Sequence, residues 1–417
     1  MEITPQTAAF IEAHAHDDPR ALALQAAKYP EVDMPLAVRQ LAARQLAARK
    51  IPSWHCTAGL WYPCHLSMEQ CSSEATAAYK ASLVEGESMA DLTGGFGIDC
   101  SFLARRFRRV TYVERQEELC ELARHNFPLL GLNDVTVCCS QAEPFLQAME
   151  PVDCLFLDPA RRDGHGGKTV AIADCEPDVA ALEPLLVSKA QRVLVKLSPM
   201  LDLSLALRTL KHVVEVHIVA VNNECKELLL VLQAEASVGD APAADAASKE
   251  GATAASSLPC AVRLHCEHIP AVGPHQHETF TLQQEREAAC PLATKVGTFL
   301  YEPNAALLKA GAFRWLAQRY GVRKLHSSSH LYTSDEPVPD FPGRCFRVEA
   351  VSGFGKKELK TFLQGMAQAN LTVRNFPMSV AELRKRLKLK EGGDAYIFAT
   401  TLADERKVLV RGRKYTS

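Results

Sequence analysis

The chain of 417 residues is 47% hydrophobic and 23% charged, which fits about two to four soluble domains and excludes a collagen, a coiled coil and a disulfide-rich scaffold. Its 47 Lys and Arg nearly balance 49 Asp and Glu, so the net charge of −2 gives no overall basic field that would attract nucleic acid. No apolar run approaches the roughly 18 residues of a membrane span, and the first residues do not resemble an export signal. We therefore expect a cytoplasmic protein whose 14 scattered cysteines are reduced.

Helical patterns dominate residues 1–85. Segments 21–28 and 35–49 are rich in Ala, Leu, Gln and Arg, which are good helix formers. Ser73 precedes a further helical segment that ends near Val84, and a serine in this position can cap the first amides of a helix. We predict an N-terminal helical region over residues 1–85.

From residue 86 the pattern changes to short apolar runs that alternate with helical segments. This alternation predicts βαβ units and a parallel sheet that is covered on both faces. The last two runs are separated only by residues 222–226, which are too few for a parallel crossover, so we expect these runs to pair antiparallel. The runs span residues 88–92, 110–114, 135–139, 152–158, 192–197, 213–221 and 228–233.

Residues 236–259 separate this α/β region from the rest of the chain. They are mostly Ala, Ser, Gly and Asp without an aromatic residue, so they cannot bury enough apolar surface to fold, and we predict a flexible linker. Beyond the linker we expect two small α+β units, over residues 260–345 and 346–417. Their expected elements are strands at 260–268, 395–401 and 407–411 and a helix at 305–320.

The C-terminal end of the chain is basic. Residues 356–417 contain 14 Lys and Arg against 6 Asp and Glu, a net charge of +8 that leaves −10 on the remainder. This segment is either a solvated helical surface or an appendage that binds a polyanion. Within it, Ser379 and Glu382 have the spacing of a capping box and predict the start of a helix.

A glycine-rich segment follows the first apolar run. It reads Asp91, Leu92, Thr93, Gly94, Gly95, Phe96, Gly97. Glycines between a strand and a helix let a ligand approach the backbone and direct the helix N-terminus at that ligand. Glu114 ends the next run, where a carboxylate can accept both hydroxyls of a ribose.

Two residues, one in this segment and one just after it, favour a sulfonium ligand over a pyrophosphate. Cys100 stands where a GxGxxG loop for pyrophosphate needs its third glycine. Asp91 adds a negative charge, which suits an ammonium or sulfonium group. A strand–helix turn without a ligand is the alternative.

Residues 86–235 resemble the class I S-adenosylmethionine-dependent methyltransferases. The resemblance lies in four motifs that follow successive strands: residues 91–97, Glu114, residues 140–143 and residues 158–162. It implies a Rossmann-like α/β fold, parallel with an antiparallel closing strand, and S-adenosylmethionine as cofactor. Gln141 stands where the family usually has an acidic residue near the adenine, and its carbonyl can still accept a hydrogen bond. The implied cofactor-binding residues are Asp91, Thr93, Gly94, Gly95, Gly97, Glu114, Gln141, Ala142 and Asp158.

A closer resemblance is to bacterial methyltransferases that have a C-terminal THUMP-like domain. It implies a ferredoxin-like domain over residues 260–345 and a THUMP-like domain over residues 346–417. Because THUMP domains bind structured RNA, mostly tRNA, the resemblance implies RNA as a partner. The segments that carry it are residues 158–162, 301–304, 330–334, 341–344, 374–377 and 391–394.

The catalytic residues are expected where the fourth strand ends, because ligands lie at the carboxyl ends of strands in such sheets. Asp158 can orient the nucleophile or act as its base, with a structural cap as the alternative. Pro159 and Arg161 complete the candidate catalytic set. Because Ala160 follows Pro159, the segment has no aromatic platform for a base, and methylation of a base amine is only suggested.

Basic and aromatic residues at two places are candidates for RNA contact. Guanidinium and ammonium groups can bind phosphates, and a phenyl ring can stack on a base. Ion pairs with acidic residues, and packing of the ring against the capped helix, are the alternatives. Residues 164–168 could close over the site. The candidates are Arg161, Arg162, Lys196, Arg374, Phe376, Arg384, Lys385 and Arg386.

The histidines and cysteines have no recognised metal-ligand spacing, even where they are densest, at residues 265–277, so we expect no metal. The leading hypothesis is S-adenosylmethionine-dependent methyl transfer to a tRNA or rRNA nucleotide, with the C-terminal domains presenting the substrate. The alternatives are a methyltransferase that acts on a protein or small molecule, and a catalytically silent RNA-binding adaptor. The sequence predicts neither the methylated atom nor the oligomeric state.

Overall fold

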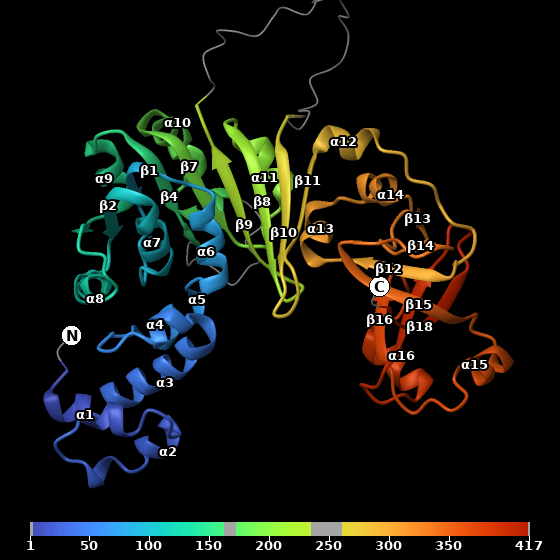
Figure 1. Ribbon diagram of the computed structural model, residues 1–417, viewed down its shortest axis with the longest axis horizontal. Coiled ribbons are helices and arrows are strands. Elements are labelled where there is room, and N and C mark those ends of the chain that lie inside the picture. Colours follow the sequence, from blue (N-terminus) through green and yellow to red (C-terminus); the bar gives the residue numbers. More distant parts are fainter. Residues whose placement is uncertain (1–2, 162–171, 235–260, 416–417) are drawn as a thin grey trace, which may run out of the picture. The chain divides into compact units, whose positions relative to one another are not determined.

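The computed structural model describes residues 3–161, 172–234 and 261–415, which belong to two compact units (Figure 1). The first unit comprises residues 1–215 and 227–257, and the second comprises residues 216–226 and 258–417. The predicted linker at 236–259 and the loop at 164–168 lie outside the described residues. None of the described helices is long and apolar enough to cross a membrane.

Six helices precede the first strand, within the helical region predicted for residues 1–85. Ser73 caps α6, because its hydroxyl accepts a hydrogen bond from the amide of Thr76 (3.3 Å). Segment 21–28 is only partly α-helical: α2 ends at Ala23 and a 3₁₀ turn follows, since the backbone of Gln25 leaves the helical region. The helices are α1 (Pro5–Ala13), α2 (Pro19–Ala23), α3 (Met34–Lys50), α4 (Pro52–His55), α5 (His65–Gln70) and α6 (Glu74–Ser82).

The sheet of the first unit has the strand order β9-β7-β4-β1-β2-β3. Neighbouring strands are parallel except β9, which is antiparallel to β7. The predicted parallel sheet with an antiparallel closing strand is therefore confirmed. The strands are β1 (Gly86–Asp91), β2 (Phe107–Glu114), β3 (Val135–Cys139), β4 (Val152–Leu157), β7 (Ala190–Leu197) and β9 (Glu224–Leu232).

The turn before β9 explains its direction. β8 (Val213–Val221) reaches β9 through Asn222 and Asn223, whose φ angles of 53° and 64° are left-handed. Two consecutive left-handed residues form the tight hairpin turn that matches the twist of antiparallel strands, and asparagine tolerates this conformation. The division between the two units falls inside this hairpin.

Helices connect the parallel strands of the first unit, and the carboxyl ends of β1, β2, β4 and β7 lie at one edge of its sheet. The short strands β5 (Ala160–Arg161) and β6 (Cys175–Glu176) pair next to this edge, after β4. The helices are α7 (Ile98–Leu103), α8 (Glu117–Leu129), α9 (Ala142–Ala148), α10 (Val179–Lys189) and α11 (Leu203–Thr209).

An aromatic cluster joins the N-terminal helices to the glycine loop after β1. The Phe96 ring lies edge-on to Trp54, with 4.9 Å between the centroids, and packs against Tyr62. The Trp54 indole donates a hydrogen bond to the hydroxyl of Ser101 in α7 (3.3 Å). Trp54, Tyr62 and Phe96 belong to one buried cluster. The helical region thus fixes the position of the loop between β1 and α7.

The second unit contains a seven-stranded sheet in the order β13-β14-β12-β15-β18-β17-β16. β12 pairs antiparallel with β15, and β17 with β18, so the two small domains expected here contribute to one sheet. A further antiparallel pair, β10 with β11, precedes it along the chain. The strands are β10 (Arg263–Ile269), β11 (Gln276–Thr281), β12 (Phe299–Pro303), β13 (Arg323–Lys324), β14 (Tyr332–Ser334), β15 (Gly343–Ser352), β16 (Asn370–Arg374), β17 (Ala395–Thr401) and β18 (Lys407–Lys414).

Two helix predictions in the second unit have different outcomes. The continuous helix at 305–320 is wrong, because Gly311 adopts a left-handed φ of 76° and ends α13. The capping box of α16 is confirmed, because Ser379 and Glu382 each bond the backbone amide of the other. The helices are α12 (Leu282–Glu287), α13 (Ala305–Ala310), α14 (Arg314–Tyr320), α15 (Lys356–Phe362) and α16 (Val380–Leu387).

Candidate active site

The loop between β1 and α7 lies against β2 because it is built from glycines. A Cβ atom added to Gly94 would lie 2.2 Å from the Tyr112 ring, so no larger residue fits. Gly95 and Gly97 have φ angles of 55° and 87°, which favour glycine. The Tyr112 hydroxyl donates a hydrogen bond to the carbonyl of Gly95. The loop is therefore fixed, while Thr93, Gly94 and Gly95 stay accessible to a ligand.

Glu114 lies at the end of β2 with both carboxylate oxygens tied to the backbone. One oxygen accepts the amide of Gly95 (2.9 Å) and the other accepts the amide of Gln116 (2.9 Å). Each carboxylate oxygen can accept a second hydrogen bond. The side chain is thus oriented in advance by the backbone.

Gln141 and Ala142 follow the next strand at the same edge. β3 pairs with β2 so that Cys139 lies opposite Glu114, and Gln141 is the residue before the first turn of α9. Gln141 is exposed, and its side chain makes no capping hydrogen bond. Both residues therefore lie beside Glu114 in the order that the sequence predicts.

Asp91 carries a buried carboxylate oxygen without a hydrogen-bond partner. The side chain is 1% exposed; Oδ1 accepts the amide of Thr93 (3.0 Å), whereas Oδ2 has no partner among the described residues. Burial raises the pKa of the Asp91 carboxyl well above its ordinary value, and the charges of Asp99, Asp158 and Glu114 add to this increase. An orphaned buried carboxylate fits a cationic ligand, which would restore the lost solvation.

We expect the affinity for S-adenosylhomocysteine, whose amino group is cationic, to rise with pH. The raised pKa means that Asp91 binds a proton in the free protein at pH values where a solvated aspartate is ionised, and only the ionised form attracts the cation. Each pKa unit of difference is worth about 1.4 kcal/mol. Calorimetry between about pH 5 and 8 measures this, and the gradient should disappear in Asp91→Asn. A pH-independent affinity of the unchanged protein would contradict the interpretation.

Asp158 comes directly after β4 and is tied to the glycine loop. Its amide donates a hydrogen bond to the Thr93 hydroxyl (2.6 Å). Its carboxylate Oδ2 accepts one from the ammonium group of Lys196, at the end of β7 (2.5 Å). The Asp158 side chain is 38% exposed, whereas Lys196 is 12% exposed. The partly exposed carboxylate of Asp158 is therefore held in place by the more buried Lys196.

Lys196 is the outer member of a buried network of charges. Its ammonium group lies 3.6 Å from Asp99, which also pairs with Lys80 (3.1 Å). Lys80 pairs with Glu227 through both carboxylate oxygens (2.7 and 2.8 Å). Lys80 is fully buried and Glu227 is 3% exposed. Acidic and basic side chains alternate from Asp158 to Glu227, so each charge lies next to one of opposite sign.

Burial and charge oppose each other in this network. Burial alone would lower the pKa of Lys196, but the carboxylates of Asp158, Asp99 and Glu227 outweigh it and raise the pKa above its ordinary value. Burial opposes ionisation of Asp99 too, yet the two lysines lower the pKa of its carboxyl. Lys196 therefore remains an ammonium and Asp99 a carboxylate.

The sequence pointed to Asp158 and Lys196 but not to Lys80, Asp99 or Glu227. Lys80 lies in α6, Asp99 in the first turn of α7 and Glu227 in β9, so no local pattern links them. The available signal was weak: Glu227 directly precedes the apolar run of β9, and Lys80 interrupts an Ala-rich helix. Ser72 joins the network through hydrogen bonds with Asp99 and Lys80.

The other residues predicted after β4 are only partly described. Pro159 is buried, and Arg161 ends β5, with its backbone opposite Cys175 of β6. Arg162 lies outside the described residues. Lys196 makes the ion pair that the sequence left open as an alternative to substrate contact.

The basic and aromatic residues predicted to contact RNA near the C-terminus lie in the second unit. Arg374 pairs with Glu302 (2.9 Å), a buried carboxylate that also holds Arg344. Phe376 stacks on Phe354 with 5.2 Å between the centroids. The Arg374 guanidinium and one face of Phe376 thus make internal contacts.

The three basic residues of α16 differ in their exposure and in their internal contacts. Arg384 donates a hydrogen bond to the carbonyl of Ala369 (3.2 Å). Arg386 lies over the Phe354 ring, 5.2 Å from its centroid, and is exposed. Lys385 is exposed. Lys385 and Arg386 are accordingly the residues of this set that a polyanion could reach.

Several histidines at residues 265–277 form side-chain hydrogen bonds. The Thr279 hydroxyl lies 3.0 Å from Nδ1 of His265 and 2.9 Å from Nε2 of His277. His277 also bonds the buried carboxylate of Glu267 (3.0 Å), which raises the pKa of His277. These contacts explain the local density of histidines within the β10–β11 pair.

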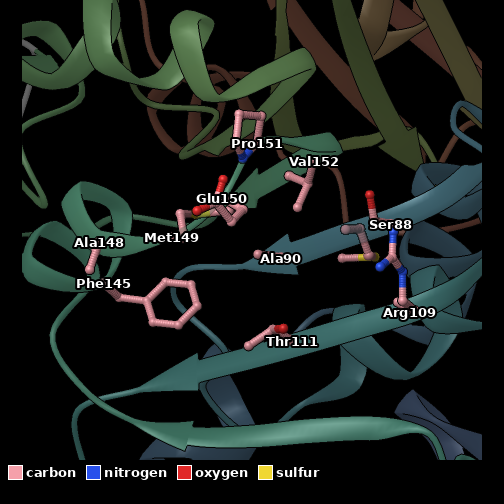
Figure 2. Close-up of a pocket in the computed structure, with 11 residues that line it drawn as sticks. Ser88, Ala90, Arg109, Thr111, Phe145, Ala148, Met149, Glu150, Pro151 and Val152 are labelled. Atoms are coloured by element: carbon pink, nitrogen blue, oxygen red, sulfur yellow. The ribbon is translucent and has the colours of Figure 1, made fainter.

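A cavity of about 410 Å³ lies on one face of the sheet of the first unit (Figure 2). Its lining includes Ala90, Arg109 and Thr111 from β1 and β2 and Phe145 from α9. Asp91, Glu114 and Asp158 are not part of the lining. The candidate site at the strand ends is therefore distinct from this cavity.

A parallel sheet with an antiparallel closing strand, a glycine loop after its first strand and a carboxylate after its second define the fold of a class I methyltransferase. Family models of a ferredoxin-like domain and of a THUMP-like domain match residues 299–342 and 343–414. A solved structure of a presumed methyltransferase from Porphyromonas gingivalis W83 is 34% identical and matches with a TM-score of 0.83 over 98% of both chains. The protein belongs to the same family as this methyltransferase and has a C-terminal THUMP-like domain.

Other solved structures are more distant. An rRNA methylase from Streptococcus thermophilus is 14% identical, with a TM-score of 0.28 over 38% of this chain and 93% of that one. A presumed methyltransferase from Streptococcus mutans in complex with S-adenosylhomocysteine is also 14% identical, with a TM-score of 0.28 over 38% of this chain and 96% of that one. No curated protein matches the chain.

Proposed function

We propose that the first unit transfers a methyl group from S-adenosylmethionine to RNA, to a tRNA or rRNA nucleotide, and that the THUMP-like part of the second unit binds that RNA. The main observation that supports S-adenosylmethionine as the cofactor is the unpartnered Oδ2 of Asp91 beside the glycine loop. A cationic methyl donor matches it in charge, and Glu114 matches the ribose. When bound, this cofactor supplies a methyl group that is already activated on a sulfonium.

The protein residues then have to position the acceptor and receive a proton. Thr93 and Lys196 hold Asp158 at the strand end where the acceptor arrives. The Asp158 carboxylate orients the acceptor through a hydrogen bond, which is the positioning that an activated donor requires. Gln141 and Ala142 lie where an adenine would continue from the ribose on Glu114.

RNA as the substrate is supported by the family-model match at residues 343–414 and by the charge of +8 over residues 356–417. Lys385 and Arg386 are the exposed cations of α16. Phosphate contacts by such residues release counterions, so binding depends steeply on salt.

Calorimetry of the full-length protein with S-adenosylhomocysteine tests the cofactor, and transfer of a labelled methyl group to RNA from a strain that lacks the gene tests the reaction. We expect binding near one molecule per chain and label in the RNA. Binding without label in RNA, but with label in protein or small molecules, would contradict RNA as the substrate.

We expect the double variant Lys385→Gln/Arg386→Gln to weaken RNA binding. Each phosphate contact that is lost should reduce the slope of log affinity against log salt by about 0.9. A filter-binding titration at several salt concentrations measures this slope. Lys295→Gln, which removes an exposed charge outside α16, serves as the control, and an equal slope in both variants would count against this surface.

A further inference from the structure

We propose that the methyl acceptor is a hydroxyl oxygen, which in RNA is the ribose 2′-hydroxyl, and that Lys196 selects it against a base amine. The inference rests on the proposed function and adds the class of accepting atom. It is based on the ion pair between the mostly buried ammonium group of Lys196 and the more exposed carboxylate of Asp158, which is the proposed contact of the acceptor.

The Asp158–Lys196 pair places two opposite charges at the end of β4 and β7. Lys196 Nζ and Asp158 Oδ2 are 2.5 Å apart. The pair leaves Oδ1 of Asp158 as the oxygen that can accept a proton from a bound group. Because Lys196 stays protonated, every acceptor that reaches Asp158 meets a cation next to that carboxylate.

Three buried residues keep the Lys196 ammonium in place. Asp99 lies between Lys196 (3.6 Å) and Lys80 (3.1 Å), and Glu227 holds Lys80 from the other side. All three are at most 10% exposed. They do not touch the acceptor, so they are positioning residues that act through Lys196.

The charge that develops on the acceptor separates the two chemistries. A neutral amine becomes positively charged as it receives a methyl group, and a nearby ammonium raises the energy of that state. A hydroxyl loses its proton and develops negative charge on oxygen, which a nearby ammonium stabilises. The fixed cation of Lys196 offsets the attraction of the Asp158 carboxylate for the cation that would form on an amine, and this shifts the preference towards oxygen.

The balanced step uses only groups already described. The bond between the acceptor oxygen and the methyl carbon forms while the bond between that carbon and the sulfonium sulfur breaks, and its electron pair stays on sulfur. The hydroxyl proton passes to the carboxylate of Asp158. The hydroxyl is a poor nucleophile until it shares this proton, which explains the use of a carboxylate and an ammonium together.

The residues after Asp158 agree with this choice. Pro159 and Ala160 follow it, so the two residues directly after the carboxylate supply no aromatic ring to stack on a base and present its amine. A ribose hydroxyl needs no such platform, because each nucleotide of an RNA chain carries one on its backbone.

The position of the label in the product tests the inference. Full-length protein transfers a tritiated methyl group to total RNA from a strain that lacks the gene, and the RNA is then hydrolysed with alkali. Alkali cuts beside a free 2′-hydroxyl but not beside a methylated one, so we expect the label in alkali-stable dinucleotides. Label in methylated bases would overturn the inference and leave the proposed function intact. No label, from protein that binds S-adenosylhomocysteine, would overturn both.

Variants of Lys196 test its role. We expect Lys196→Met to slow label transfer by roughly 100-fold, because it removes the charge that stabilises the oxyanion. Its affinity for S-adenosylhomocysteine should stay within about threefold. Lys196→Arg should recover part of the rate.

The matched control is Lys189→Met. Lys189 directly precedes β7, at the end opposite to Lys196, and its ammonium group donates a hydrogen bond to the Met149 carbonyl. This variant should transfer at the unchanged rate. Equal rates in Lys196→Met and Lys189→Met would overturn the role of Lys196.

Discussion

Gly94→Ala is expected to weaken cofactor binding about 100-fold while the chain still folds. The added Cβ would lie 2.2 to 2.5 Å from three atoms of the Tyr112 ring, so the loop or the ring must move. The ring is anchored by its hydroxyl on Gly95, and Gly95 in turn bonds Glu114, so a shift would disturb every contact that places the ribose. Overpacking of this kind costs about 1–3 kcal/mol or more. If the whole cost falls on the ligand-bound loop, affinity for S-adenosylhomocysteine drops about 100-fold.

Calorimetry measures the affinity, and circular dichroism shows whether the fold persists. Gly131→Ala is the control, because a Cβ there meets nothing within 4 Å, although Gly131 also has a positive φ of 75°. This variant should lose some stability and keep its cofactor affinity. An unchanged affinity in Gly94→Ala would mean that the loop between β1 and α7 does not hold the cofactor.

The sequence predicted the features of this site that are local in the chain. The acid, glycines and later glutamate of residues 91–114 are close together, and the short connection at Asn222 and Asn223 dictates an antiparallel pair whatever surrounds it. The capping box at Ser379 was predictable for the same reason, since its two residues are three apart. The turn and the capping box each contain their physical cause within a few residues.

The charge network was not predictable, because its members come from distant segments. Lys80 and Glu227 are 147 residues apart, and nothing near either residue reveals the other. Arg374 was predicted to contact RNA, yet its charge is partly taken by Glu302, which is 72 residues away. A charged residue in a sequence does not reveal whether folding will bring it a partner, and only the tertiary structure supplies that information.

Lys80→Met should destabilise the fold more than any of the other single substitutions. Lys80 is fully buried between Glu227 and Asp99, and its loss would leave Glu227 buried without its counter-ion. Breaking a buried pair by removing one partner typically costs about 3–5 kcal/mol of unfolding free energy. Replacing both partners, in Lys80→Met/Glu227→Leu, should recover most of this loss, because an apolar pair needs no counter-ion.

The pH dependence distinguishes the loss of charge pairing from a simple packing defect. Burial already raises the pKa of Glu227 while Lys80 opposes the increase, so removing Lys80 raises that pKa further. A carboxyl whose pKa is higher in the folded than in the unfolded state contributes stability at low pH and loses it as pH rises through the folded value. The stability deficit of Lys80→Met should therefore grow with increasing pH, whereas a cavity would cost the same at every pH.

Urea unfolding followed by tryptophan fluorescence measures these differences. Of the three tryptophans, Trp54 and Trp61 lie in the first unit, so a Trp315→Phe background reports on that unit alone. Lys28→Met, which changes an exposed lysine whose ammonium group bonds Gln25, should change stability by less than about 0.5 kcal/mol at any pH. If the deficit of Lys80→Met were independent of pH and persisted in the double variant, the buried charges would not act as a unit, and Lys196 would have to be held in place by packing alone.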